Sequence, residues 1–256
     1  MTKLKFIYLF FIPLILGCET EKKKPKINLI GEWSKIEKIE SDDFPPMFYR
    51  PFGIGFTKDK IELFNGFKRY DQDSITEKTQ LNYKGTFTDY KVKNDSIFIL
   101  NPFNENWEFK WKIKEQLTDT LILAKNDTTL IKLQRIKERK DNSFDQIIFS
   151  SSGCYGFCPI IDISLNNKNK IYFQGEGHVK PLGFYESIID SIKTDYIFSK
   201  FVQANIESLK SDYTAGHTDD ESITTTFVKN GQIIKTINDY GKVCPKELIW
   251  AYVPIQ

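Results

Sequence analysis

Apolar and polar residues alternate along much of the chain before residue 136. In Trp107–Lys114 the apolar residues Trp107, Phe109, Trp111 and Ile113 face one way, and charged residues face the other. This strict period of two predicts a β-strand with one buried and one solvated face. Similar patterns predict strands at Leu29–Ile39, Ile54–Phe64, Leu81–Val92, Ser96–Leu100, Thr120–Ala124 and Thr129–Ile136. So many short strands, without a long amphipathic helix, indicate a small antiparallel barrel or sandwich.

The pattern changes after the polar run Lys137–Ser143, which we interpret as a linker. Strands are predicted at Ile147–Ser150, Ile160–Leu165, Lys170–Gln174, Phe184–Ile189, Ile223–Lys229 and Gln232–Asn238. One helix is predicted over Thr194–Asn205, with Thr194 as its N-cap, and a second from Pro245 at its first position. We therefore expect a β-rich protein of two domains: an antiparallel barrel over residues 27–136 and an α+β domain over residues 144–256.

The N-terminus has the layout of an export signal. Lys3 and Lys5 precede the apolar run Phe6–Leu16, which is shorter than the roughly 20 residues that cross a bilayer. The run ends in Leu16-Gly17-Cys18, which resembles the lipobox of bacterial lipoproteins. The resemblance implies that residues 1–17 are a signal peptide and that Cys18 carries the lipid. An ordinary secretory signal or an uncleaved anchor is the alternative.

The expected location follows from this anchor. Residues 18–26 are polar and charged, which predicts a lipidated cysteine followed by a solvated tether. Glu19 follows the cysteine, in place of the aspartate that often marks inner-membrane retention, so the resemblance implies a lipid-anchored protein of the bacterial outer membrane. Whether it faces the periplasm or the cell surface stays open. The net charge is only +2 and no basic patch stands out, so nucleic acid is not an expected partner.

Gly31-Glu32-Trp33, near the start of the first predicted strand, resembles the G-x-W opening of lipocalin-like barrels. In that family the tryptophan closes one end of the barrel and a late arginine packs over it. The resemblance implies that Arg135 packs on Trp33, within about 6 Å. The alternative is a strand-start tryptophan in another β-sandwich. Such barrels often bind small apolar ligands, but in one this small we favour a core filled by its own side chains.

Three cysteines follow Cys18, namely Cys154, Cys158 and Cys244. An exported protein meets oxidising conditions, so paired cysteines tend to form disulfides. Loop entropy favours a Cys154–Cys244 bridge, at about 4.6 kcal/mol, over a Cys154–Cys158 bridge, at about 2 kcal/mol. A redox site would need Cys-x-x-Cys at a helix start, and no second motif completes a zinc site with either histidine. A redox site and a zinc site are therefore weaker alternatives to a disulfide.

Cys154-Tyr155-Gly156-Phe157-Cys158-Pro159 resembles the signature of a bacterial domain-of-unknown-function family, number 6438. Thr218-Asp219 and Asn230-Gly231 match later features of that family, so the resemblance covers nearly the whole second domain. It implies no activity, because the family has none assigned. Since both cysteines lie inside the signature, we expect Cys154 and Cys158 to form a disulfide that staples a turn, with Gly156 at positive φ. Cys244 is then expected to be a buried free thiol.

One polar cluster, His217, Asp219 and Asp220, is a weak candidate site, because a solvated loop explains it as well. No catalytic residue, metal site or cofactor is expected. The favoured function is a noncatalytic envelope lipoprotein that binds a small apolar ligand or an envelope protein. The alternatives are an accessory subunit without a small ligand and an enzyme with an unrecognised site. An apolar cavity in the barrel would favour the binding lipoprotein. A filled barrel with exposed apolar groups would favour the accessory subunit.

Overall fold

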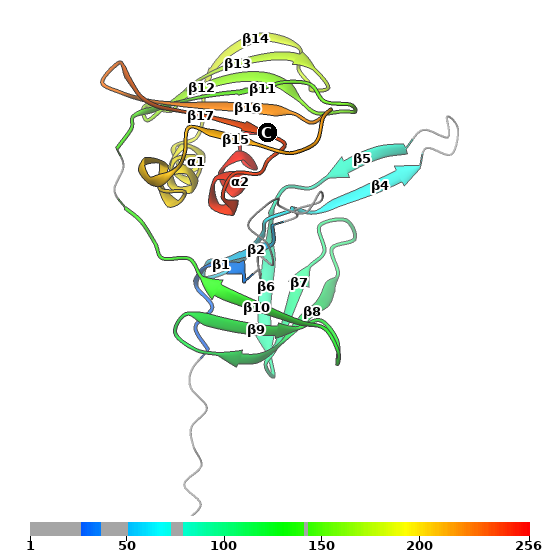
Figure 1. The fold of residues 1–256 in the computed structure, drawn as a ribbon. Helices are drawn as coiled ribbons and strands as arrows, with labels where there is room; N and C mark the ends of the chain where they lie inside the picture. The colour runs from blue at the N-terminus through cyan, green and yellow to red at the C-terminus, as the bar shows by residue number, and fades with distance from the viewer. Residues whose placement is uncertain (1–26, 37–50, 73–78, 141–142) are drawn as a thin grey trace, which may run out of the picture.

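The computed structural model describes residues 27–36, 51–72, 79–140 and 143–256. Within these residues the chain folds into a closed β-barrel followed by a seven-stranded sheet with two α-helices (Figure 1). The helices lie between the sheet and the barrel, so one face of the sheet is covered and the other points away from the barrel. The expected β-rich architecture, with an antiparallel barrel preceding an α+β region, is confirmed. Cys18 lies outside the described residues.

The barrel is an up-and-down arrangement in which each strand pairs antiparallel with its neighbours. Its strands are β1 (Gly31–Lys35), β2 (Gly53–Phe56), β3 (Lys60–Leu63), β6 (Phe87–Lys93), β7 (Ser96–Leu100), β8 (Trp107–Gln116), β9 (Thr120–Ala124) and β10 (Leu130–Arg135). Pairing of β10 with β1 closes the barrel. Between β3 and β6, strands β4 (Lys68–Gln72) and β5 (Thr79–Tyr83) form a separate hairpin that projects from the barrel wall (Figure 1).

Several boundaries differ from the prediction. Ile54–Phe64 is two strands, because the chain reverses at Lys58-Asp59, where the Thr57 N–H donates to the Lys60 carbonyl at 2.9 Å. Leu81–Val92 is likewise divided, around Lys84-Gly85. Strand β4 and the short β15 (Asp212–Thr214) were not expected. Neither has enough alternating apolar residues to leave a periodic signal.

Trp33, Gly31 and Arg135 lie together where β1 meets β10. The Trp33 side chain is fully buried and its Nε1 donates to the Leu29 carbonyl at 2.7 Å. The Arg135 guanidinium lies 4.0 Å from the centre of the Trp33 ring, inside the expected 6 Å. It also donates to the carbonyls of Thr118 and Asn28, at 3.0 and 3.1 Å. A Cβ on Gly31, which has φ 117°, would stand 2.8 Å from Arg135 Nη1, so only glycine lets the arginine approach.

Apolar side chains fill the barrel interior, in agreement with the packed core favoured from its size. The buried set is Leu29, Trp33, Ile54, Phe56, Ile61, Leu63, Phe67, Ile97, Ile99, Trp111, Ile113, Leu121, Leu123 and Leu133, with Phe52 and Phe103 packed against it. Phe64, which follows β3, belongs instead to the core of the second domain. The barrel is therefore stabilised by its own side chains.

Strand β8 does not keep one continuous buried face. Trp111 and Ile113 are buried, but Trp107 and Phe109 are exposed. The pairing with β7 shifts between Ile97 and Phe98, because Ile97 lies opposite Trp111 and Phe98 opposite Phe109. This bulge places one extra residue on β8. The side chains of Trp107 and Phe109, which precede the bulge, therefore point to the other face of the strand. The expectation that all four apolar residues share one buried face was wrong for this reason.

The second domain is built on one sheet with the strand order β14-β13-β12-β11-β16-β17-β15. Its strands are β11 (Gln146–Ser151), β12 (Ile160–Asn166), β13 (Lys170–Gly177), β14 (Gly183–Ile188), β15, β16 (Ser222–Lys229) and β17 (Gln232–Tyr240). All neighbours pair antiparallel except β15 and β17, which are parallel. Buried residues alternate along the central strands, as on β11, where Ile147, Phe149 and Ser151 face the core.

Two helices cover this core. Helix α1 (Ser191–Gln203) begins three residues earlier than predicted, because the side chain of Asp190, and not Thr194, caps it by accepting from the Ile192 N–H at 2.7 Å. Helix α2 (Lys246–Tyr252) follows Pro245, which is its N-cap and not its first helical residue. Five consecutive residues of α2, Leu248 to Tyr252, are buried. In the part of the chain described, no helix is long and apolar enough to cross a membrane.

Both helices also pack against the barrel. Trp250 of α2 lies over Phe64, with ring centres 5.5 Å apart, and a Cβ on Gly53 of β2 would come within 2.8 Å of its ring. Trp250 Nε1 donates to Glu62 of β3 at 2.9 Å. Lys200 of α1 reaches the same carboxylate at 2.8 Å and Glu32 of β1 at 2.5 Å. An apolar and ionic interface thus joins the two domains.

Candidate functional site

The structure contains the Cys154–Cys158 disulfide, with the Cα atoms 5.6 Å apart, and so confirms the pairing implied by the signature. The bridge closes a turn between β11 and β12, and Ser151 Oγ donates to the Pro159 carbonyl across its base at 2.7 Å. Gly156 does not adopt the expected positive φ. Its N–H donates to the Cys154 carbonyl at 2.8 Å, so the turn closes in an ordinary backbone conformation.

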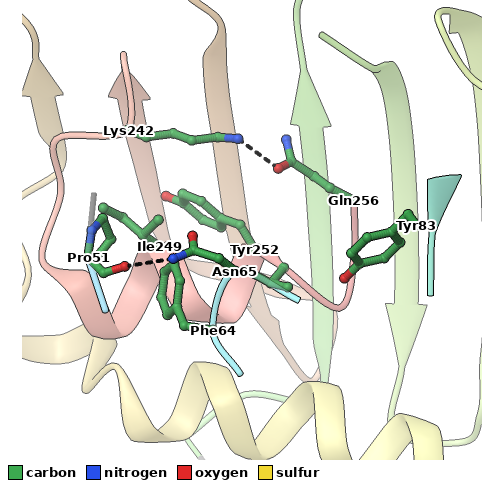
Figure 2. Close-up of a pocket in the computed structure, with 9 residues that line it drawn as sticks. Pro51, Phe64, Asn65, Tyr83, Lys242, Ile249, Tyr252 and Gln256 are labelled. Atoms are coloured by element: carbon green, nitrogen blue, oxygen red, sulfur yellow. Dashed lines mark hydrogen bonds between the residues drawn. The ribbon is translucent and has the colours of Figure 1, made fainter. Parts of the chain in front are cut away.

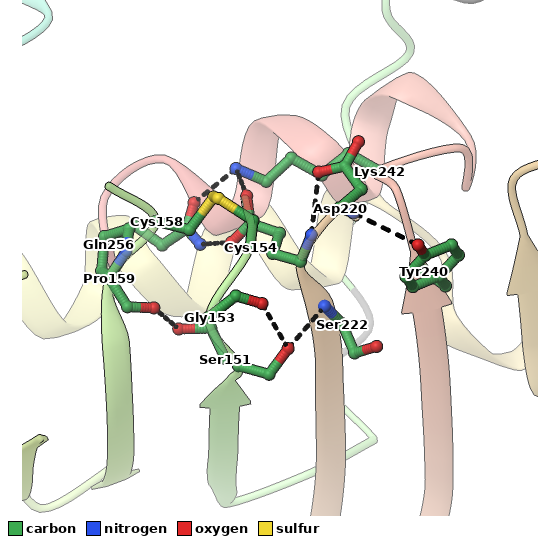
Figure 3. The surroundings of a disulfide bond; sticks show 12 residues. Ser151, Gly153, Cys154, Cys158, Pro159, Asp220, Ser222, Tyr240, Lys242 and Gln256 are labelled. Carbon is green, nitrogen blue, oxygen red and sulfur yellow. Dashed lines mark hydrogen bonds and ion pairs between the residues drawn. A yellow bond between two sulfur atoms is a disulfide. The ribbon is translucent and has the colours of Figure 1, made fainter. Parts of the chain in front are cut away.

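The disulfide turn is attached to the loop that carries the polar cluster. Tyr155 N–H donates to the Asp219 carbonyl at 2.9 Å. Ser152 and Ser222 exchange two further bonds, from the Ser152 N–H to the Ser222 carbonyl and from the Ser222 N–H to Ser152 Oγ, each 2.9 Å long. Figure 3 shows Asp220, Ser222 and Tyr240 around the bridge. The two motifs that stood out in the sequence therefore form one surface, although more than fifty residues separate them.

The polar cluster itself is only partly assembled. His217 Nε2 lies 3.0 Å from Asp220 Oδ2, and these side chains remain 32% and 37% exposed. The Asp220 N–H also contacts the Tyr240 hydroxyl at 3.2 Å. Asp219 contributes its backbone carbonyl to the disulfide turn, while its side chain contacts Thr218. Among the described residues, no three histidine, cysteine or carboxylate side chains converge as metal ligands. The arrangement stabilises a loop and lacks a buried reaction centre.

A buried ion pair borders this surface. Glu221 is almost inaccessible and pairs with Lys242, which follows the end of β17. Gln256 binds both partners, because it accepts from Lys242 Nζ and donates to Glu221, each at 2.9 Å. Figure 3 shows Lys242 and Gln256 in the surroundings of the disulfide. Glu221 ends the sequence cluster that begins at His217, but Lys242 was not predicted as its partner, since one lysine among many leaves no distinguishing pattern.

Cys244 is the free, buried thiol expected from the odd cysteine count. Burial, followed by the nearby Asp239 carboxylate, raises the pKa of the Cys244 thiol well above its usual value. Burial likewise raises the pKa of Asp239, which accepts from the Val243 and Cys244 N–H groups at 2.9 and 3.3 Å. A protonated thiol is a poor nucleophile and a poor metal ligand, so Cys244 has a packing role.

The most conspicuous feature of the surface is its exposed aromatic pair. Tyr155 is 92% exposed and Phe157 is 88% exposed, and both lie inside the disulfide turn. The Phe157 ring meets His178 edge-on, with ring centres 5.5 Å apart. The bridge and the Tyr155–Asp219 hydrogen bond hold the backbone under both rings. We call Tyr155 and Phe157 the aromatic pair below.

Comparison with known proteins supports the assignment of the second domain. Residues 145–256 match the family described as Domain of unknown function (DUF6438). No curated protein and no solved structure matches the chain. The family match covers the disulfide turn, the polar-cluster loop and both helices, so the aromatic pair lies within the matched domain.

Proposed function

We propose that this protein is a noncatalytic, lipid-anchored component of the bacterial cell envelope that binds a protein partner through the aromatic pair. The observation that carries the proposal is the presentation of two almost fully exposed aromatic rings on a covalently closed turn. Aromatic residues are enriched among the residues that dominate binding energy at protein interfaces. Because the turn is already ordered, little conformational entropy is lost when it binds.

The neighbouring charges define the chemistry of such a partner. Tyr155 is hydrogen-bonded to the Asp219 backbone, which brings the exposed Asp219 side chain beside it, with Asp220 next along the loop. A partner surface with an apolar pocket bordered by lysine or arginine would complement this surface. The filled barrel supports a protein partner over a small ligand in the barrel interior. We therefore propose the second alternative, an accessory subunit of an envelope assembly, as the form of this function.

The anchor part of the proposal rests on Leu16-Gly17-Cys18 and the polar tether after it. Each buried CH₂ group of an acyl chain contributes about 0.8 kcal/mol to membrane attachment, so two or more chains hold a protein stably. By the same resemblance, we place the protein at the outer membrane. The closed barrel and the disulfide domain would then stand off the membrane on the residue 18–26 tether.

Replacing Cys18 with alanine should abolish lipid attachment, because no thiol remains at the lipidation position. We expect the variant to leave the membrane fraction or to accumulate unprocessed, as judged by fractionation and intact mass. The matched control is Cys244→Ala, which removes a buried thiol of the second domain and should leave membrane attachment unchanged. Wild-type retention and the same cleaved mass for Cys18→Ala would refute the lipoprotein proposal.

A photo-reactive phenylalanine at position 155 or 157 should cross-link to one dominant protein in membranes of the source organism. The same group at Phe184, which is also exposed but lies on the edge strand β14, is the control. Adducts at 155 and 157 but not at 184 are expected, and mass spectrometry then identifies the partner. No adduct at either turn position, or the same adducts at all three, would contradict binding through the aromatic pair.

A further inference from the structure

A pocket of about 330 Å³ opens between the barrel domain and the second domain. This volume is at the lower end of the roughly 300–1,000 Å³ that is typical of small-molecule sites, and about twice that of a cavity that holds benzene. From the barrel side it is lined by Pro51, Phe64, Asn65 and Tyr83 (Figure 2). Tyr83 belongs to β5, so the projecting hairpin contributes one wall. The pocket is distinct from the filled interior of the barrel.

The second domain supplies the facing wall through α2 and the segments around it. Ile249, Tyr252 and Val253 line this side. Figure 2 shows Lys242 and Gln256 at one edge. The walls are held in place by the interface between the domains, where Phe64 packs on Trp250 and Lys200 bridges Glu32 and Glu62. A pocket between two such fixed surfaces is preformed, which reduces the cost of binding.

The chemistry of the lining is mainly apolar, with a few hydrogen-bonding groups. Pro51, Phe64, Ile249 and Val253 provide apolar surface. The Asn65 amide donates to the Pro51 carbonyl at 3.4 Å, and its own oxygen is an acceptor on the wall. Tyrosine hydroxyls are neutral at physiological pH, and burial raises the pKa of both Tyr83 and Tyr252 further above the usual tyrosine value.

Among the described residues that line the pocket, the one cation is Lys242, and its charge is already neutralised. Its ammonium pairs with Glu221, which is only 6% exposed, and with the Gln256 side-chain oxygen at 2.9 Å. An anionic ligand would have to compete with a buried carboxylate for this charge, and a cationic ligand would meet the ammonium directly. The pocket therefore selects against both signs of charge.

We infer that this interdomain pocket binds a small, neutral, largely apolar molecule that carries one hydrogen-bonding group, such as an amide or a hydroxyl. The site does not depend on the proposed protein-binding function, because the aromatic pair does not line it. It is also separate from the barrel interior, which apolar side chains fill. The Glu221–Lys242 pair sets its preference for uncharged ligands.

Three matched probes test this preference: 2-naphthamide, 2-naphthoate and 2-naphthylmethylammonium, measured by fluorescence with the full chain in lipid nanodiscs. Empty nanodiscs correct for partition into lipid. We expect the amide to bind at least about tenfold more tightly than either charged probe. No saturable binding of the amide at millimolar concentration, or equal or tighter binding of a charged probe, would overturn the inference.

Two variants test the location. Val253→Trp should fill the pocket and weaken amide binding at least about tenfold, whereas Ile234→Trp, on the exposed part of β17 away from the pocket, should leave it unchanged. Glu221→Gln should free the Lys242 charge and shift the naphthoate-to-amide preference at least about tenfold towards naphthoate. Unchanged binding by folded Val253→Trp would refute the location. If Val253→Trp does not fold, an unchanged naphthoate-to-amide preference in Glu221→Gln would refute the location instead.

Discussion

Replacing Lys200 with methionine should lower the free energy of unfolding by about 3–5 kcal/mol, because it leaves the buried Glu62 carboxylate and the partly exposed Glu32 carboxylate without their cation. Lys200 is only 3% exposed, and its ammonium lies 2.8 Å from Glu62 and 2.5 Å from Glu32. It also lies 4.0 Å from the centre of the Trp250 ring. Methionine keeps most of the side-chain volume. The loss of stability would therefore come from the missing charge more than from lost packing. Urea denaturation at neutral pH measures it.

The matched control for Lys200 is Lys60→Met. Lys60 pairs with Asp89 at 2.6 Å on the barrel surface, where both side chains are about half exposed. Such pairs contribute about 0–1 kcal/mol. Adding Glu62→Gln to Lys200→Met should recover part of the loss, because one uncompensated charge is removed. A loss for Lys200→Met no larger than for Lys60→Met would show that the charges between the domains are solvated.

Replacing Trp33 with alanine should cost about 3–5 kcal/mol, the range for emptying a large aromatic site in a packed core. Trp33 is fully buried, donates to the Leu29 carbonyl at 2.7 Å and lies under the Arg135 guanidinium. The variant therefore leaves a cavity and removes the surface on which Arg135 rests, where β1 meets β10. Thermal and urea unfolding of the full chain measure the change.

Trp107→Ala is the control for Trp33, because Trp107 belongs to the same barrel but lies on its outer surface beneath Lys91, 3.8 Å from the ring centre. Its loss should cost about 1 kcal/mol or less, which is typical of an exposed cation–π pair. Similar losses for both variants would contradict the assignment of Trp33 to barrel closure.

Local patterns predicted much of this fold. Strands β7 and β9 begin and end at the predicted residues, because turn residues delimit both of them. The disulfide followed from the cysteines of the signature, although loop entropy alone would have chosen Cys244. In these places the information lies within a few consecutive residues.

The features that the sequence did not reveal depend on contacts between distant segments. The bulge in β8 arises from its pairing with β7, so the alternation in Trp107–Lys114 could not show that Trp107 and Phe109 turn outward. The attachment of Tyr155 to Asp219, and the pocket between the domains, exist only after the sheet has assembled. Lys200 did leave a signal, since it lies between Ile197 and Phe201 on the apolar side of the predicted helix. A lysine in that position indicates a buried ion pair when the helix is covered on two sides.

In the proposed function, Tyr155 and Phe157 form the contact with a protein partner. Its most direct test is the dissociation constant between the full chain and the partner identified by cross-linking, measured for wild type, Tyr155→Ala, Phe157→Ala and the control Phe184→Ala. Each turn variant is expected to bind at least about tenfold more weakly, with Phe184→Ala unchanged, because exposed aromatic anchors dominate such interfaces. Affinities of both turn variants equal to that of wild type would show that the aromatic pair is not the contact.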